Sequence, residues 1–336
     1  MTSAKRRSDL RVAIVGFGSI GHRHFENLRS LGVGEVIVVR RPARANPAFT
    51  PSLGTPVAYS PQAALQYGVD LAVICNPTSL HVPTAQTFVA ADVPVLIEKP
   101  AADRLRPAVE LAELADGRGV HVGVAYCMRY HPAYAAARGA VEAGKIGRLL
   151  YAKAWFESYL PDWHPWEDYR ESYAARKDLG GGVLPTLDHE IDFLNWCLGT
   201  PLSADCQTTR TGALEANVDD WAVVSLRYAG GVRGAAHLSL CRRDYARGFE
   251  LVGKTGTLSY GFDTKKLRLI STSQPAPEIL WDGGGHDLNT MYRDMLADFL
   301  DSVVAGRPAP VPLESGIQTL RVGTAKTEVN SASSMV

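Results

Sequence analysis

The feature that most constrains this chain is a glycine-rich turn between a mostly apolar run and a helical stretch. Residues 10–15 lead directly into GFGSIGHRH, where Gly16, Gly18 and Gly21 have GxGxxG spacing. In a βαβ unit that binds a dinucleotide, these glycines permit the tight turn, the approach of the pyrophosphate and the packing of helix on strand. The phosphates then lie on the helix N-terminus. A glycine turn without a ligand is the alternative, but the preceding strand favours the dinucleotide interpretation.

Length and composition limit the class of protein. The chain has 336 residues, which predicts two domains, and its 35 basic and 35 acidic residues balance. The net charge therefore gives no reason to expect nucleic acid or an anionic membrane as a partner. We find no apolar stretch of membrane-spanning length and no apolar core of a secretion signal before Asp9. Five scattered cysteines without CxxC spacing predict reduced thiols and no metal site, as in a cytoplasmic protein.

The first third of the chain alternates strand-like and helix-like segments. We expect strands at 11–15, 36–40, 71–75, 95–98 and 121–125, and helices that include 21–31, 80–90 and 105–116. This alternation predicts an α/β fold with a parallel, doubly wound Rossmann sheet that binds its ligand beyond the carboxyl ends of the strands. We assign residues 1–126 to this NAD(P)-binding domain.

The pattern changes after about residue 126. We expect helices at 133–143, 187–198, 289–305 and 315–331, and strands at 149–159, 202–209, 219–228, 232–241, 249–253, 256–260 and 267–270. Tight glycine turns between consecutive strands predict a C-terminal α/β domain, residues 127–336, with a large, mostly antiparallel open sheet. The last helix is free to pack back on the first domain, and the final six residues should be disordered. An open sheet leaves an apolar face uncovered in a monomer, so we expect a homodimer or homotetramer.

The end of the second strand bears on the choice of cofactor. A NAD-preferring unit places an acidic residue there, but this strand ends in Arg40 and Arg41. Guanidinium groups pair with a 2′-phosphate, which favours NADP(H) over NAD(H). Two solvated arginines in a protein that uses either cofactor are the alternative.

Two further motifs carry candidate catalytic groups. Lys99, in Glu98-Lys99-Pro100, follows a strand on the ligand side of the sheet, where its amine could donate to a substrate hydroxyl; Pro100 allows a cis bond before it. An exposed loop lysine is the usual alternative.

On the helix after Gly180–Gly182, residues 187, 191, 194 and 198 form an apolar stripe for the sheet. His189, Asp192 and Trp196 fall on the opposite face, where a histidine beside a carboxylate suits a general base. A plain helix start explains the same residues without chemistry.

Together these motifs resemble the Gfo/Idh/MocA family of sugar and cyclitol oxidoreductases, over roughly residues 10–330. In chain order, the matching pieces are GFGSIGHRH, residues 75–78 with His81, the triplet 98–100, residues 125–132, the triple glycine with His189-Glu190-Ile191-Asp192, and residues 253–258. The resemblance implies an N-terminal domain that binds the nicotinamide cofactor. It also implies a C-terminal domain that supplies substrate residues and the oligomer interface.

The resemblance implies roles for individual residues. It makes Lys99 and His189 the pair that handles the proton. The implied cofactor residues, beside Arg40 and Arg41, are Gly16, Gly18, Ser19, Ile20 and Gly21 at the pyrophosphate, Asn76, Thr78 and His81 beside the nicotinamide, and Glu98 and Arg129 near the nicotinamide or substrate. Many members carry an aspartate three or four residues before the histidine, where this chain has Thr186 and Pro185. Either Asp188 or Asp192 compensates, or Lys99 and His189 act alone.

The segment 159–170 combines aromatic and polar side chains as a carbohydrate pocket does. The candidate substrate residues are Tyr126, Trp163, His164, Trp166, Tyr169, Arg170 and Arg242. The loop could equally pack on a neighbouring domain or subunit. Arg242, Arg243 and Arg247 form a second basic group that could bind an anionic part of the substrate or a partner subunit.

The combined interpretation is hydride transfer between NAD(P)H and a secondary alcohol or ketone of a sugar, amino sugar, nucleotide sugar or cyclitol. His189 would take the hydroxyl proton while Lys99 polarises the same oxygen. Two alternatives remain: a cofactor-binding sensor or regulator of the same fold, and a glycosidase that uses tightly held NAD.

Overall fold

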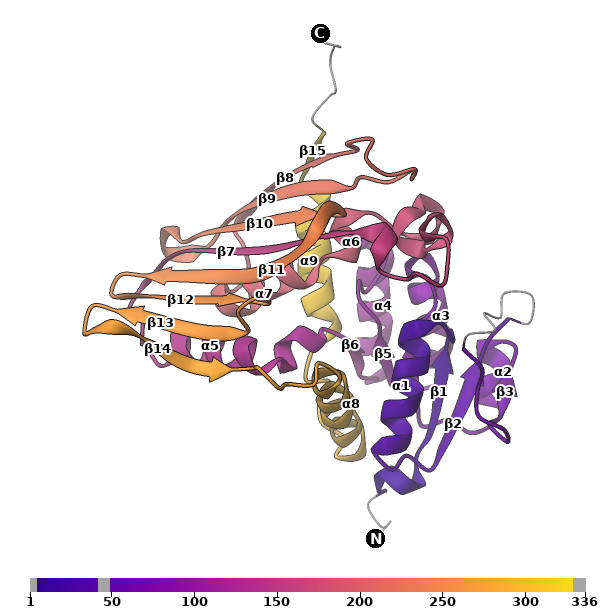
Figure 1. Cartoon of the computed structure of the whole chain (residues 1–336). Coiled ribbons are helices and arrows are strands. Elements are labelled where there is room, and N and C mark those ends of the chain that lie inside the picture. Colours follow the sequence, from indigo (N-terminus) through magenta and orange to yellow (C-terminus); the bar gives the residue numbers. More distant parts are fainter. Residues whose placement is uncertain (1–4, 42–48, 329–336) are drawn as a thin grey trace. The chain divides into compact units, whose positions relative to one another are not determined.

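The computed structural model describes residues 5–41 and 49–328 (Figure 1). Within these residues the chain forms two compact units. Unit 1 contains the chain up to Tyr130 together with Asp287–Leu320. Unit 2 contains His131–His286 and the chain from Arg321 onward. The described chain therefore passes from unit 1 into unit 2 after Tyr130, returns to unit 1 at Asp287, and passes into unit 2 again at Arg321.

Unit 1 is built on a parallel sheet, six-stranded in the described part of the chain, with the order β3-β2-β1-β4-β5-β6. Its strands are β1 (Arg11–Val15), β2 (Glu35–Val39), β3 (Val57–Ala58), β4 (Leu71–Ile74), β5 (Val95–Ile97) and β6 (Val122–Val124). This is the doubly wound order, in which the chain reverses direction across the sheet between β1 and β4. The predicted Rossmann fold is confirmed.

Helices cover both faces of this sheet. The helices of unit 1 are α1 (Ser19–Ser30), α2 (Pro61–Leu65), α3 (His81–Val89), α4 (Leu105–Arg118), α8 (Asn289–Val304) and the part of α9 (Leu313–Thr324) that ends at Leu320. Helix α1 packs on β1 and β2 and beside α8, whereas α3 packs on β4 and β5 and beside α4. Because both faces are covered, the strands are continuous apolar runs, and Val12, Ile14 and Val73 are completely buried.

Unit 2 is built on a larger sheet, nine-stranded among the described residues, with the order β14-β13-β12-β11-β7-β10-β9-β8-β15. Its strands are β7 (Leu149–Tyr159), β8 (Ser203–Thr209), β9 (Trp221–Arg227), β10 (Arg233–Ser239), β11 (Cys241–Gly253), β12 (Gly256–Gly261), β13 (Lys266–Ser271), β14 (Gln274–Asp282) and β15 (Lys326–Glu328). Strands β7 and β10 pair in parallel, as do β8 and β15, and the other neighbours are antiparallel. The predicted mostly antiparallel sheet is confirmed.

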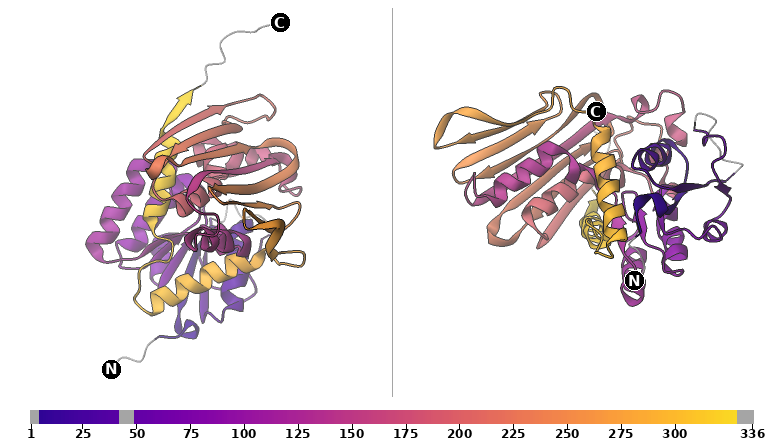
Figure 2. Two further views of the ribbon diagram at one scale, coloured as in Figure 1. Left: turned by 90° about the vertical axis from the view of Figure 1, so that its left-hand side faces the viewer. Right: turned by 90° about the horizontal axis from the view of Figure 1, so that it is seen from below.

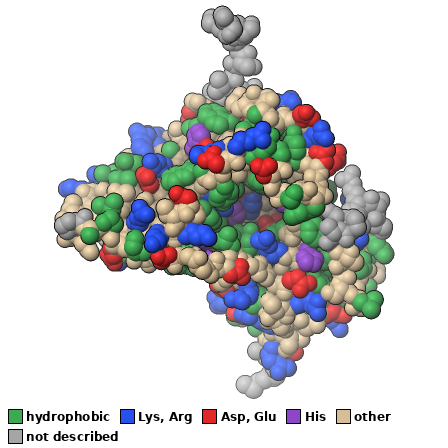
Figure 3. Space-filling view, in the orientation of Figure 1, with side chains coloured by type: hydrophobic (Ala, Val, Ile, Leu, Met, Phe, Trp, Pro, Cys, Tyr) green, Lys and Arg blue, Asp and Glu red, His purple; other side chains and the backbone are tan. Residues whose placement is uncertain are grey.

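Helices α5 (Pro132–Glu142) and α7 (His189–Leu198) lie against one face of this sheet (Figure 2). The inward side chains of β7 and β11, among them Ala152, Phe249 and Leu251, are buried beneath them. A short helix, α6 (Val183–Thr186), precedes α7. On the molecular face drawn in Figure 3, basic and acidic side chains are interspersed over the described parts of each unit.

Several predicted elements were wrong. The expected helix 315–331 ends at Thr324, and Lys326–Glu328 instead form β15, which pairs with β8. Strand β11 begins at Cys241 rather than residue 249, and β3, α2 and β14 were not predicted. The disorder expected for the last six residues concerns positions outside the described chain. The cysteines are free, but Cys75, Cys197 and Cys241 are only partly buried. Within the described chain, no helix is both long enough and apolar enough for a bilayer.

His131 is the N-cap residue of α5 and lies in an aromatic cluster of unit 2. Its Nδ1 accepts a hydrogen bond from the Ala133 N–H at 3.2 Å, and its ring centroid is 5.1 Å from that of Trp281. Burial lowers the pKa of His131 to about 3, and the neighbouring charges of His286 and Arg247 add to this effect. The imidazole is therefore neutral in the folded protein at ordinary pH.

This depressed pKa predicts a loss of stability in acid. His131 becomes protonated near pH 6.5 in the unfolded chain but stays neutral at that pH in the folded chain. The free energy of unfolding therefore decreases as the pH falls below about 6.5. From pH 7 to pH 5 we expect His131 to contribute a loss of about 2 kcal/mol. Urea unfolding of wild type and His131→Asn at both pH values measures it. The asparagine can still cap α5 but does not titrate. The free energy of unfolding of the variant should therefore decrease between pH 7 and pH 5 by about 2 kcal/mol less than that of wild type. Equal losses in the two proteins would contradict the assignment.

Candidate functional site

The glycine turn lies at the carboxyl end of β1, beside the end of β4. The Gly16 N–H donates to the Val39 carbonyl at 2.9 Å, and the Cys75 N–H donates to the Val15 carbonyl at 2.7 Å. These bonds hold the ends of β1, β2 and β4 together around the turn. Ligands of doubly wound sheets bind at this point, where strand order reverses.

Each glycine meets a different steric demand. Gly16 has φ +94°, and a Cβ there would lie 2.6 Å from the backbone of Asn76. A Cβ on Gly21 would lie 2.1 Å from the Gly16 carbonyl oxygen, so only glycine lets α1 pack this closely. Gly18 has nothing within 4 Å of its Cβ position. The turn therefore leaves open space in front of the α1 N-terminus, which fits a pyrophosphate on the N–H groups of its first turn.

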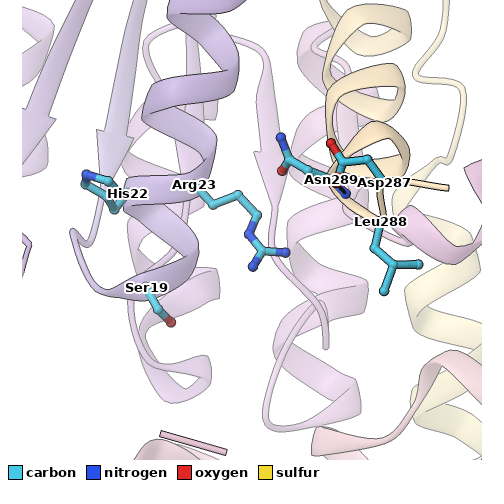
Figure 4. Close-up of a pocket in the computed structure, with 6 residues that line it drawn as sticks. All are labelled: Ser19, His22, Arg23, Asp287, Leu288 and Asn289. Atoms are coloured by element: carbon cyan, nitrogen blue, oxygen red, sulfur yellow. Dashed lines mark hydrogen bonds between the residues drawn. The ribbon is translucent and has the colours of Figure 1, made fainter. Parts of the chain in front are cut away.

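A pocket of about 500 Å³ opens beside this turn (Figure 4). It is lined by Ser19, His22, Arg23, Asp287, Leu288 and Asn289. The Arg23 side chain extends from α1 toward the start of α8 (Figure 4), and its guanidinium lies 4.6 Å from the ring centroid of Tyr292. Arg23 thus adds a positive charge near the predicted phosphate position, which sequence reasoning missed.

The two arginines after β2 have different surroundings. The Arg40 guanidinium donates to the Phe49 carbonyl at 3.3 Å, and its N–H donates to the Ala58 carbonyl at 3.1 Å. Arg41 is exposed. Of the two, Arg41 is the more accessible to a ligand.

Lys99 follows β5 and is preceded by a fixed carboxylate. The Glu98 carboxylate contacts His24 Nε2 at 2.6 Å through one oxygen and accepts the Lys99 N–H at 3.1 Å through the other. His24 is completely buried and Glu98 is 8% exposed. Burial raises the pKa of Glu98, but the hydrogen bond with His24 and the charge of Lys99 outweigh it, so the pKa lies below its usual value. The Lys99–Pro100 peptide is cis, as the motif allowed.

His81 connects the segments after β4 and β5. Its Nε2 lies 2.7 Å from the Asn76 carbonyl and its Nδ1 lies 2.8 Å from the Pro100 carbonyl. Burial lowers the pKa of His81, and these two carbonyls oppose that shift. Asn76 donates its amide to Thr84, and Thr78 is buried in the adjoining turn. The described contacts of His81 thus fix the backbone around Lys99, and its place beside the nicotinamide stays a prediction.

In unit 2, His189 is the first residue of α7. The predicted helix start at residue 187 was wrong, because Leu187 has φ −113° and ψ 30° and separates α6 from α7. Ile191 and Leu194 are buried as the stripe predicted. His189 is 8% exposed and Asp192 only 1% exposed, so burial extends around the first turns of the helix. Asp188 and Thr186 are also buried.

The sequence analysis missed the contact between Glu190 and Arg247. Arg247 Nε lies 2.7 Å from Glu190 Oε1, and the two side chains are 9% and 1% exposed. Arg247 is therefore buried and paired within unit 2, whereas Arg242 and Arg243, with which it was expected to form a basic group, are exposed. The alternation of Arg247, Phe249 and Leu251 was the available signal, because it places all three on one face of β11.

The segment 159–170 is held by contacts of its own. The Trp163 indole donates to Ser158 at 2.8 Å, and its ring is parallel to that of Phe156 at 6.0 Å. His164 contacts Glu167 at 2.8 Å and stacks on Trp166. The remaining predicted substrate residues also have partners. Tyr169 accepts a hydrogen bond from the Glu215 N–H, and Arg170 pairs with Asp168 and Glu215. Arg242 pairs with Asp244 and Glu157, and the buried Tyr126 ring lies near the Arg129 guanidinium. Trp166 is half exposed. Substrate binding by these residues stays a prediction.

The described residues contain no group of three His, Cys, Asp or Glu side chains placed to hold a metal ion. The polar groups at the carboxyl edge of the unit 1 sheet include the backbone N–H groups of the first turn of α1, the Lys99 amine and the Arg40 and Arg41 guanidinium groups, beside the Glu98 carboxylate. Groups of this kind suit an anionic organic cofactor.

Comparison with known proteins agrees with this geometry. A model of the oxidoreductase family GFO/IDH/MocA, NAD-binding Rossmann fold, matches residues 10–126, and the GFO/IDH/MocA C-terminal domain model matches residues 134–259. Together they cover more than two thirds of the chain.

Individual relatives match over most of their length. The chain is 24% identical to the rhizopine catabolism protein MocA of Rhizobium meliloti over 326 residues, which is 96% of this chain and 95% of the relative. It is 27% identical to an inositol 2-dehydrogenase of Pseudomonas syringae pv. syringae (strain B728a), over 88% of this chain and 87% of the relative. A levoglucosan dehydrogenase solved in complex with NADH has the same fold, with a TM-score of 0.78 and 19% identity over 94% of this chain and 95% of that one.

The family match and the glycine turn at the strand-order reversal agree on a nicotinamide-dependent enzyme. The chain belongs to the GFO/IDH/MocA family and is an NAD(P)-dependent oxidoreductase that acts on CH–OH groups.

Proposed function

We propose that this enzyme interconverts a secondary alcohol and a ketone on a sugar, amino sugar, nucleotide sugar or cyclitol. One observation carries the proposal: Lys99 follows β5 at the same carboxyl edge of the unit 1 sheet as the glycine turn after β1. An amine is thereby held at the edge where the cofactor binds, and its backbone is fixed by Glu98. In this proposal the N-terminal domain binds the cofactor and the C-terminal domain binds the substrate.

We assign the proton chemistry to Lys99 and His189. His189 accepts the hydroxyl proton during oxidation, and the Lys99 ammonium donates a hydrogen bond to the same oxygen as negative charge develops on it. The bound nicotinamide supplies or accepts the hydride. Thr186 stands where many family members have an aspartate, so the buried Asp188 and Asp192 are the candidate supporting carboxylates.

The names of the relatives support a polyhydroxylated substrate. One relative is an inositol 2-dehydrogenase, and a protein of the same fold is a levoglucosan dehydrogenase. The segment 159–170 adds stacked aromatic rings and paired polar groups, features that suit the C–H faces and hydroxyls of such a ring.

The test of the reaction is a screen at 340 nm of both cofactors against sugars, cyclitols and nucleotide sugars. We expect turnover with at least one of them. Cofactor binding without turnover on any of them would favour the regulator alternative. Cofactor retained through purification without net reduction of added cofactor would favour the glycosidase alternative.

With the substrate found, His189→Ala should lower kcat by about 10²- to 10⁴-fold, because it removes the proton acceptor. The Kd for NAD(P)H, measured by nicotinamide fluorescence, should stay within about twofold, since uniform cofactor binding is separate from the chemical step. His121→Ala is the matched control, because His121 lies just before β6, at the opposite edge of the sheet. Loss of cofactor binding with unchanged turnover per bound cofactor would contradict this role.

We propose that NADP(H) is the preferred cofactor, through the exposed guanidinium of Arg41. Arg41→Ser should raise the KM for NADPH by about tenfold to a hundredfold, the worth of a hydrogen bond to a charged group, and leave that for NADH nearly unchanged. Arg118→Ser, at the far end of α4, is the control. Equal effects on both cofactors would contradict the preference.

We also propose a homodimer or homotetramer that uses the open face of the unit 2 sheet. Tyr151 on β7 is 46% exposed on that face and lies between Arg233 and Val252 of the neighbouring strands. Light scattering of the full-length protein, measured as it elutes from a sizing column, should give the mass of a dimer or tetramer. Tyr151→Glu should shift that mass toward the monomer with unchanged circular dichroism, because it buries a charge in place of an aromatic ring at the proposed subunit contact. A monomeric wild type would overturn the proposal.

A further inference from the structure

We infer that Arg247, acting through Glu190, is a positioning residue for His189. The inference rests on the proposed function, in which His189 handles the proton. Glu190 directly follows His189 in the first turn of α7, and Arg247 reaches it from β11 across 57 residues of sequence. The pair therefore links the first turn of α7, which carries the imidazole, to strand β11 of the unit 2 sheet.

The start of α7 is not held by a side-chain cap. Asp188 is the residue before the helix, and its side chain makes no capping hydrogen bond to the helix N–H groups. Helix α6 ends at Thr186, and the non-helical Leu187 separates it from Asp188. A helix start without a cap is more stable when a side chain of its first turn is anchored elsewhere. The Glu190 carboxylate provides that anchor by accepting from Arg247 Nε at 2.7 Å.

The anchor is rigid because its surroundings are apolar and aromatic. The Arg247 guanidinium lies 4.5 Å from the ring centroid of Phe156 and 5.4 Å from that of Phe262. Burial works to lower the pKa of Arg247, but the charge of Glu190 outweighs it and the pKa lies well above its usual value. The other titratable groups that face it include Tyr134 of α5 and Tyr245 of β11. Arg247 is thus a permanent cation with Glu190 as its carboxylate partner.

Stability alone does not explain this pair. A buried ion pair is often no better than two apolar side chains of similar volume, because desolvation offsets the attraction. Arg247 Nη2 is buried and has no hydrogen-bond acceptor among the described residues, which adds to that cost. What the pair provides, and apolar side chains would not, is a directional bond between β11 and the residue next to His189.

The variant that tests the inference is Arg247→Met with Glu190→Met. Either single change leaves a buried charge without its partner and is expected to lower Tm strongly, whereas the double change removes both charges and should keep Tm near or above that of wild type. The first readout needs no substrate: the ¹³C–¹H signal of the His189 ring, assigned from His189→Gln, in the full-length protein. We expect the signal to move or split in the double variant, because the first turn of α7 loses its anchor.

Two further variants make the readout specific. Arg247→Lys keeps a cation opposite Glu190 and should retain the wild-type His189 signal. Arg138→Met is the matched control: Arg138 pairs with Glu142 at 2.7 Å and lies over Trp196 of α7 at 4.6 Å, but at the far end of the helix. It should leave the His189 signal unchanged. A folded double variant with the wild-type signal, or an equal change in Arg138→Met, would overturn the inference.

The second readout uses the substrate that the cofactor screen identifies. In the double variant kcat should fall by about 10²-fold, as for a misplaced catalytic group, with the Kd for NAD(P)H unchanged. A kcat within twofold of wild type would also overturn the inference. If wild type turns over no substrate, the proposed function fails, and the ring signal still decides whether Arg247 positions His189.

Discussion

The close approach of α1 to the glycine turn is the constraint on which the candidate cofactor site at the carboxyl edge of the unit 1 sheet depends. A methyl group on Gly21 would lie 2.1 Å from the Gly16 carbonyl, so any side chain there would push the helix off the sheet. With the helix moved, its first N–H groups would no longer point into the space left by Gly18. The absence of side chains at Gly16 and Gly21 is therefore what allows α1 and the turn to pack this closely.

Both candidate catalytic residues are held by the same physical device. Glu98 precedes Lys99 and contacts the buried His24, and Glu190 follows His189 and pairs with the buried Arg247. In each case a buried carboxylate next to the reactive residue is bonded to a group far away in the chain. Such a bond fixes the backbone beside the candidate catalytic residue.

The sequence predicted the bounds of β1, which is mostly a continuous apolar run, and of β7, which is rich in aromatic residues, as the structure has them. It failed for β3, with only two residues, and for β14, whose two prolines are unusual in a strand. β15 was missed because its pairing with β8 is not local. The motifs located Lys99 and His189, but not the partners of the adjacent glutamates, since local periodicity carries no information about contacts 57 or 74 residues apart.

The irregular start of β11 has a consequence for how relatives of this chain can vary. Pairing with β7 is interrupted between Cys241 and Ala246, and it resumes with Ala246 opposite Glu157 and Arg247 opposite Phe156. Such an interruption can absorb an inserted or deleted residue without changing the register beyond it. Residues 242–245 are all exposed. This stretch is therefore a place where natural length variation could accumulate while the pairing of β11 with β7 beyond it is kept.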